Sequence, residues 1–137
     1  MTVIIDASVG VKWIVPEEDH EAAAALIGDQ RLYAPALFFS EVGNALVKKH
    51  RRGEIVIAEV AQSFADLPLL ITSVDECRVM GRAMQLATEL GHSIYDCVYV
   101  ALAEDMRVEL VTADLKFVAK LEGHAARRHV VPLKERA

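Results

Sequence analysis

Short apolar runs alternate with longer segments of helical periodicity along the chain. The apolar runs predict five short strands, over residues 2–5, 32–34, 69–72, 109–113 and 130–133. Apolar positions that recur every three or four residues predict helices between them, over residues 8–14, 17–27, 36–52, 55–67, 75–90, from 94 onward and 115–121. This alternation predicts an α/β fold, a three-layer sandwich with a mainly parallel central sheet.

The helix that begins near residue 94 and the strand that follows it carry two acids in unusual positions. Asp96 lies three residues after Ser93, which is the spacing of a capping box, but Cys97 and Val98 beside it belong to a wide apolar face. An ionised carboxylate in such surroundings is costly unless it is paired or bound to a metal. Asp114 stands at the carboxyl end of the strand at 109–113, where ligands bind in open α/β sheets. Both acids are therefore candidate ligand-binding residues.

Two further acids repeat these placements. Asp6 ends the first strand as Asp114 ends a later one, although an Asp followed closely by Ser8 is also typical of turn and helix-cap chemistry. Glu41 lies in a helix among phenylalanine, valine and leucine side chains, although half-exposed acids in helices are common as well. Asn44 follows three residues later and lies beside Glu41 on the helix.

If these four acids converge, they need a counter-charge. Two carboxylates about 4 Å apart repel each other by roughly 4 kcal/mol at an effective dielectric near 20. The basic residues at helical spacing from one of the acids are Lys48 and Lys49, both about two turns beyond Glu41. A hard divalent cation is the simplest neutraliser, and an all-oxygen ligand set favours Mg²⁺ or Mn²⁺ over Zn²⁺. Such a site suits the hydrolysis of phosphodiester bonds.

The composition is that of one compact domain. With 137 residues, 53% of them hydrophobic and 26% charged, we expect a single domain over residues 1–137. No apolar run approaches the roughly 18 residues that cross a bilayer, and the first residues do not form a signal peptide. Cys77 and Cys97 lie in apolar helical patterns, so we expect reduced core thiols and a cytoplasmic protein without membrane contact.

The charge distribution bears on nucleic-acid binding. The formal net charge of −5 argues against a general nucleic-acid coat protein, but not against a nuclease whose acids are neutralised by cations. The helix at 36–52 ends in one dense basic run, Lys48-Lys49-His50-Arg51-Arg52. Such a run is typical of a solvated helix end that complements the helix dipole. The functional alternative is a rim that contacts phosphates.

Four motifs in this order resemble a known family. They are Val-Ile-Ile-Asp6-Ala-Ser8, then Ser40-Glu41-Val-Gly-Asn44, then Tyr95-Asp96-Cys-Val-Tyr-Val-Ala-Leu-Ala, and then Val111-Thr112-Ala-Asp114-Leu-Lys-Phe. Together they closely resemble the PIN-domain ribonucleases and, among these, the VapC toxins of prokaryotic type II toxin–antitoxin modules. Any one motif would be weak evidence, but the resemblance spans nearly the whole chain.

The resemblance implies a site, an activity and partners. It implies that an acidic quartet binds Mg²⁺ or Mn²⁺ and acts in catalysis, supported by three polar residues: Asp6, Glu41, Asp96 and Asp114, with Ser8, Asn44 and Thr112. The implied protein is a PIN-like endoribonuclease that cuts RNA such as tRNA or rRNA, forms a homodimer and is neutralised by a cognate VapB-type antitoxin. The RNA contacts are then expected from Lys48, Lys49, Arg51 and Arg52. One departure is Lys116, which stands where many relatives carry another acid.

Two other functions compete with this interpretation. A phosphatase or receiver-type aspartyl-phosphate domain also gathers acids around Mg²⁺ at strand ends. It needs a paired acid near the first strand and a lysine at a later strand end, and this chain has Asp6-Ala7-Ser8 and no such lysine. The second alternative is a catalytically silent PIN-like binding module that acts through partner proteins, against which the intact quartet argues. In a binding module, Trp13, Phe38 or Phe39 would serve docking rather than core packing.

Overall fold

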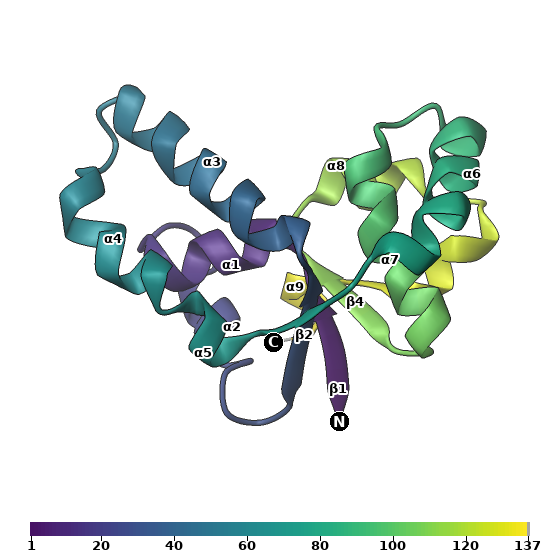
Figure 1. The fold of residues 1–137 in the computed structure, drawn as a ribbon, viewed down its shortest axis with the longest axis horizontal. Helices are drawn as coiled ribbons and strands as arrows, with labels where there is room; N and C mark the ends of the chain where they lie inside the picture. The colour runs from purple at the N-terminus through teal and green to yellow at the C-terminus, as the bar shows by residue number, and fades with distance from the viewer. Residues whose placement is uncertain (137) are drawn as a thin grey trace.

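A five-stranded sheet lies between two layers of helices in the computed structural model, which describes residues 1–136 (Figure 1). The strands are β1 (Thr2–Ile5), β2 (Arg31–Pro35), β3 (Thr72–Val74), β4 (Glu109–Thr112) and β5 (Val130–Pro132). They are ordered β3-β2-β1-β4-β5, and each neighbouring pair is parallel. The predicted α/β sandwich with a parallel central sheet is confirmed.

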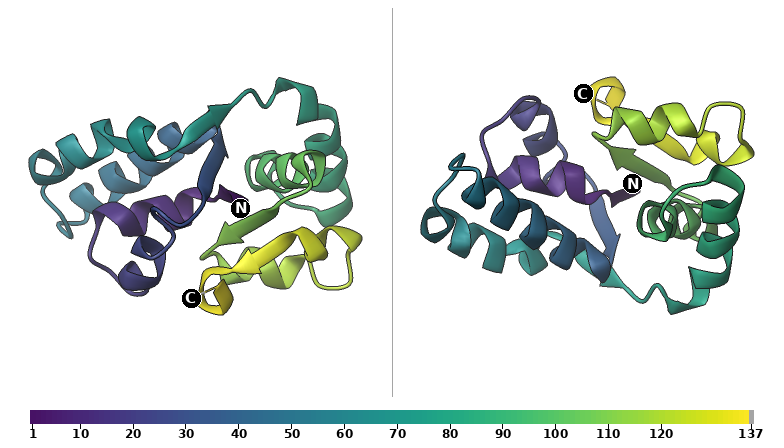
Figure 2. Two further views of the ribbon diagram at one scale, coloured as in Figure 1. Left: turned by 90° about the horizontal axis from the view of Figure 1, so that it is seen from below. Right: turned by 90° about the horizontal axis from the view of Figure 1, so that it is seen from above.

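The helices divide between the two faces of this sheet. They are α1 (Ala7–Ile14), α2 (His20–Ala24), α3 (Leu37–Arg51), α4 (Ile57–Ala65), α5 (Leu67–Leu70), α6 (Met80–Leu90), α7 (Ile94–Met106), α8 (Leu115–Lys120) and α9 (Leu133–Arg136), with short 3₁₀ turns η1 (Cys77–Val79) and η2 (Ala125–His129). Figures 1 and 2 show α1, α3 and α4 on one face and α6, α7 and α8 on the other. The chain winds outward from β1 in one direction and from β4 in the other, so the strand order reverses between these two central strands.

The carboxyl ends of β1 and β4 lie side by side at this reversal. Ile5 is the register partner of Val111, and the backbone N–H of Asp6 donates to the carbonyl of Val111 at 3.0 Å. The chain therefore leaves both strands at the same edge of the sheet. Residues that directly follow the two strands, such as Asp6 and Asp114, enter the same crevice.

Helix α7 forms the centre of the second layer. It packs against β1, β2, β4 and α6, and every residue from Cys97 to Ala103 is buried. A helix that is apolar on all sides belongs in the interior, which explains why this segment has no polar face. Its first turn, which carries Asp96, emerges at the carboxyl edge of the sheet.

One predicted strand is wrong. The apolar run expected to form a strand over 69–72 instead forms the helical turn α5, and pairing with β2 begins at Thr72. Pro68 lies in the first turn of α5, where its fixed φ favours a helix start. Periodicity cannot distinguish a helical turn from a strand in so short an apolar run. The helix expected over 17–27 is also shorter, because it is confined to α2, and the one expected over 75–90 begins as η1 and continues as α6.

Some of the side chains discussed above are placed as expected and others are not. Ser93 holds the N-cap position of α7, but its side chain forms no cap hydrogen bond to the described backbone, so the expected capping box is absent. Cys97 is buried as expected, whereas Cys77 is exposed because it lies in the surface turn η1. Phe38 is buried, and Trp13 and Phe39 pack against the core. Within residues 1–136, no helix is long and apolar enough to cross a bilayer.

Gly10 allows α1 and α3 to pack closely beside the crevice. A Cβ at this position would lie 2.6 Å from Cζ of Phe38, a side chain that is fully buried and has no room to move. We therefore expect Gly10→Ala to lower the free energy of unfolding by roughly 1–3 kcal/mol, measured by urea denaturation. Gly81→Ala in α6 is the matched control, because a Cβ there meets no described atom within 4 Å. It should raise stability by about 0.4–1 kcal/mol. Equal stabilities for the two variants would contradict the close packing of α1 on α3.

Candidate active site

The four acids singled out in the sequence line one pocket. It has a volume of about 290 Å³ and lies at the carboxyl ends of β1 and β4, between α1 and α3 on one side and α7 on the other. Its lining residues are Asp6, Ala7, Ser8, Val11, Glu41, Asn44, Ala45, Lys48, Asp96 and Asp114. As these side chains stand, no three His, Cys, Asp or Glu residues among 1–136 are close enough to hold a metal ion. The acids thus share a pocket but do not form a closed ligand cage.

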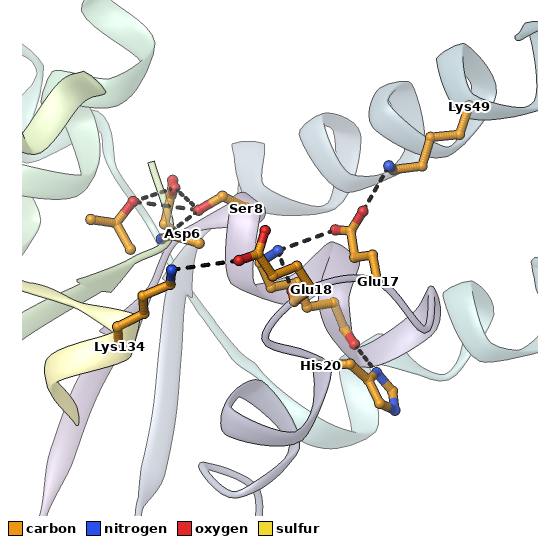
Figure 3. A network of polar contacts seen from close by, with 10 residues as sticks. Asp6, Ser8, Glu17, Glu18, His20, Lys49 and Lys134 are labelled. Carbon is orange, nitrogen blue, oxygen red and sulfur yellow. Dashed lines mark hydrogen bonds and ion pairs between the residues drawn. The ribbon is translucent and has the colours of Figure 1, made fainter. Parts of the chain in front are cut away.

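Asp6 is the most enclosed of the four acids, with 9% of its surface exposed. The hydroxyls of Ser8 and Thr112 both donate to its Oδ2 atom, at 2.5 and 2.9 Å. Figure 3 shows the bond from Ser8 to Asp6. Burial raises the pKa of Asp6, and the nearby charge of Asp96 raises it further, while the two hydroxyls act in the opposite direction. Asp6 holds the N-cap position of α1, but its side chain makes no cap hydrogen bond to the described residues. The alternative interpretation of Asp6 as a helix cap therefore fails.

The same two hydroxyls organise the loop that carries Asp114. The backbone N–H of Ala113 donates to Ser8 Oγ at 3.0 Å, and that of Asp114 donates to Thr112 Oγ1 at 3.1 Å. Asp114 Oδ1 in turn accepts from the backbone N–H of Phe117 at 3.1 Å and caps α8. Asp114 is thus both the cap of α8 and a lining residue of the pocket.

Glu41 reaches the pocket from α3 and is held by a residue that the sequence did not single out. The phenol of Tyr99 donates to Glu41 Oε1 at 2.7 Å. Burial, together with the negative charges of Asp6, Asp96 and Glu76, raises the pKa of Glu41 to about 7, although the hydrogen bond from Tyr99 opposes the shift. The pKa of Tyr99 is also raised by its burial, so its hydroxyl remains a donor. Tyr99 lies three residues after Asp96 and therefore on the same face of α7. This spacing could have identified Tyr99 from the sequence as a residue near the acids.

Asp96 is also held by a residue that sequence reasoning missed. His92 Nε2 lies 2.5 Å from Asp96 Oδ2, and the His92 ring packs against the ring of Phe117 with centroids 4.9 Å apart. The aromatic contact and the contact to the carboxylate together fix the imidazole beside the pocket. The spacing of four residues between His92 and Asp96 was visible in the sequence. None of the other three acids has a histidine at this spacing, so the pair did not form part of the expected pattern.

The polar and basic residues separate into two groups. Lys48 lines the pocket, as does Asn44, which makes no side-chain hydrogen bond to any of the four acids among the described residues. Lys49 points to another face of α3 and pairs with Glu17 at 2.8 Å, as Figure 3 shows. Glu17 also lies 3.5 Å from Lys12. Arg51 and Arg52 are exposed at the end of α3, beyond Lys48.

Comparison with known proteins adds a family to this geometry. The family model of the PIN domain matches residues 3–121. The chain is 34% identical to Ribonuclease VapC3 of Pyrobaculum aerophilum, over 88% of this chain and 95% of that protein. It is 31% identical to Ribonuclease VapC12 of Mycobacterium tuberculosis, over 94% of this chain and 98% of that one.

Solved structures share the fold. PAE2754 from Pyrobaculum aerophilum superposes with a TM-score of 0.70 at 23% identity, over 98% of this chain and 91% of that one. VapBC2 from Rickettsia felis, bound to a DNA fragment from its promoter, superposes with a TM-score of 0.61 at 15% identity, over 96% and 98%. A toxin–antitoxin complex from Klebsiella pneumoniae gives 0.57 at 14%, over 96% and 97%. The domain match and the relatives above 30% identity establish that this chain belongs to the PIN-domain family, among the VapC ribonucleases.

Proposed function

We propose that this chain is a metal-dependent endoribonuclease and the toxin of a type II toxin–antitoxin module. The observation that carries the proposal is the single pocket into which four carboxylates project at the strand-order reversal of the sheet. That pocket occurs in a chain whose relatives are named as VapC ribonucleases. The proposed reaction is the hydrolysis of a phosphodiester bond in RNA.

The donor set of the pocket fits a divalent metal ion. None of the four acids forms an ion pair with a Lys or Arg within residues 1–136, and burial raises the pKa of both Asp6 and Glu41. Carboxylates that lack a counter-charge repel one another, so an open arrangement is expected before a cation binds. Oxygen donors select Mg²⁺, with Mn²⁺ as a substitute. Bound there, such an ion supplies Lewis-acid stabilisation of the charge that develops on the phosphate.

The residues of the chain have separate roles in this proposal. Asp6, Asp96 and Asp114 would hold the metal ion, and Glu41 would position a second ion or accept a proton from the attacking water. The pKa of about 7 belongs to the metal-free pocket, and the positive charge of a bound ion would lower it, which favours the ionised carboxylate that accepts a proton. The contacts from Ser8, Thr112 and His92 restrict the orientation of the carboxylates that they touch, as outer partners of metal ligands do.

The basic residues of α3 would hold the RNA backbone. Lys48 is in the pocket, and Arg51 and Arg52 continue the same helix face one turn further on, so a strand of RNA can run from the acids along this face. Lys49 pairs with Glu17 and would contact RNA only after this pair opens. Asn44 lies between Glu41 and Lys48 and can donate its amide to a phosphate or a base.

A VapB-type antitoxin is the proposed partner. Structural neighbours of this chain include a toxin–antitoxin complex from Klebsiella pneumoniae and VapBC-1 from nontypeable Haemophilus influenzae, both of which share its fold. The homodimer, and a tRNA or rRNA target, remain predictions from the family resemblance. A catalytically silent module remains the alternative, and metal-dependent cleavage by the purified protein would exclude it.

The raised pKa of Glu41 predicts a specific pH dependence of stability in the metal-free protein. The group ionises near pH 7 when folded and near pH 4.5 when unfolded, so the folded state retains a proton that the unfolded state has lost. The free energy of unfolding of the wild type should therefore fall relative to that of Glu41→Gln as pH rises from about 4.5 to about 7. Gln can still accept the hydrogen bond from Tyr99. Denaturation curves in EDTA that keep a constant difference across this range would contradict the burial of Glu41.

Substitution of Asp6 tests the proposed function most simply. Asp6→Asn keeps the shape and the hydrogen-bond acceptor for Ser8 and Thr112, but it removes the charge, so we expect Mg²⁺-dependent cleavage of RNA to fall roughly 100-fold or more. The fold should be retained, since a buried charge is removed. Asp105→Asn is the matched control, because Asp105 is an exposed acid paired with Arg78 on the surface. Cleavage by Asp6→Asn at the rate of wild type would refute the assigned site.

A further inference from the structure

A second pocket adjoins the acidic one. It has a volume of about 350 Å³ and is lined by Leu37, Ser40, Glu41, Asn44 and Tyr95. Glu41 and Asn44 also line the acidic pocket, so these two side chains form a wall that the two pockets share. The lining residues of α3 recur every three or four positions and form one face of the helix, and Tyr95 closes the pocket from the first turn of α7.

Tyr95 is exposed in a way that packing does not explain. Tyr95 is 61% exposed, and it is the one exposed Phe, Trp or Tyr among residues 1–136. The residues of α7 from Cys97 to Ala103 are buried, so the neighbouring part of the helix is part of the core while this ring is not. Its phenol forms no hydrogen bond to another described residue, in contrast to Tyr99, whose phenol is bound to Glu41. An aromatic ring therefore lies open beside the pocket of the four acids.

We propose that this second pocket binds one unpaired nucleobase of the RNA substrate, with the base stacked on Tyr95. The inference rests on the proposed nuclease function and adds a binding site for the base to it. The rings of nucleobases stack on aromatic side chains in single-stranded RNA, and their edges form hydrogen bonds to polar groups. Tyr95 and Leu37 supply apolar surface, while the Ser40 hydroxyl and the Asn44 amide supply donors and acceptors at the rim.

The position of the pocket favours a base over a peptide side chain as its occupant. A base bound there would belong to a nucleotide whose phosphate reaches the acids, because Glu41 forms part of both walls. The basic residue Lys48 lines the acidic pocket two turns beyond Glu41 along α3, and its charge complements that of the phosphate. A base can enter only if it has left its helical stack.

The test combines Tyr95 variants with an RNA that lacks one base. Binding of a fluorescent single-stranded RNA is measured in the Asp6→Asn background, which is expected to leave the RNA intact, and cleavage is measured with Asp6 present. We expect Tyr95→Ala to weaken RNA binding by about 5- to 150-fold, the range found for loss of one stacking contact. Tyr95→Phe should restore most of the binding, because it keeps the ring. Met84→Ala in α6, which removes a side chain that is also 61% exposed, is the matched control and should have no effect.

An RNA with an abasic nucleotide beside the cleaved bond completes the experiment. If the missing base stacks on Tyr95, the abasic RNA should bind wild-type Tyr95 more weakly than the intact RNA, but the two RNAs should bind Tyr95→Ala alike. Two results would overturn the base site. In the first, intact RNA binds Tyr95→Ala as tightly as it binds the protein with Tyr95. In the second, the abasic RNA still binds Tyr95→Ala more weakly than the intact RNA does. Loss of partner-protein binding in Tyr95→Ala with unchanged RNA binding would also overturn it.

The cleavage assay distinguishes failure of the base site from failure of the nuclease site. If Asp6→Asn is inactive while Tyr95→Ala cleaves normally, only the base site fails. If Asp6→Asn cleaves normally, the nuclease site itself fails.

Discussion

The buried carboxylate of Asp6 at the end of the central strand is the feature on which the rest of the site depends. A charge in this position is unfavourable, and burial raises its pKa despite two hydrogen bonds from Ser8 and Thr112. The same hydroxyls bind the backbone around Asp114, so one small network fixes the ends of β1 and β4 together. In a marginally stable domain this arrangement costs stability, and the proposed cation site gives a physical reason for that cost.

The doubly wound sheet explains how distant residues reach this network. Glu41 comes from a helix on one face and Asp96 from a helix on the other, and the bond between Tyr99 and Glu41 joins these two layers at the carboxyl edge of the sheet. Gly10 lets α1 approach α3 closely enough to bring Ser8 and Glu41 into the same pocket. The basic face of α3 then leads away from the acids, and the second pocket opens beside them under Tyr95.

The acids at the strand ends could be predicted from the sequence, but several local turns and side-chain contacts could not. Asp6 and Asp114 could be predicted because each follows a short apolar run, and a parallel sheet places the ends of both strands at one edge. Their ends meet because β1 and β4 are neighbours in the strand order. The strand expected at 69–72 failed because a four-residue apolar run fits a helical turn as well, and Pro68 favours the turn. Tyr99 was missed because its partner Glu41 lies 58 positions away in the sequence. Lys48 and Lys49 look alike in the sequence, yet successive residues of a helix face different directions, so one lines the pocket and the other pairs with Glu17.

A crystal structure of the protein with Mn²⁺, using the anomalous signal of the metal, tests the central claim most directly. The account predicts an anomalous peak inside the pocket of four acids, with oxygen atoms of Asp6, Asp96 and Asp114 around it at about 2.0–2.3 Å, the usual range for small divalent ions. Crystals saturated with Mn²⁺ that show no peak there, or show peaks only at other surface acids, would contradict the account and leave the convergence of these carboxylates without a cause.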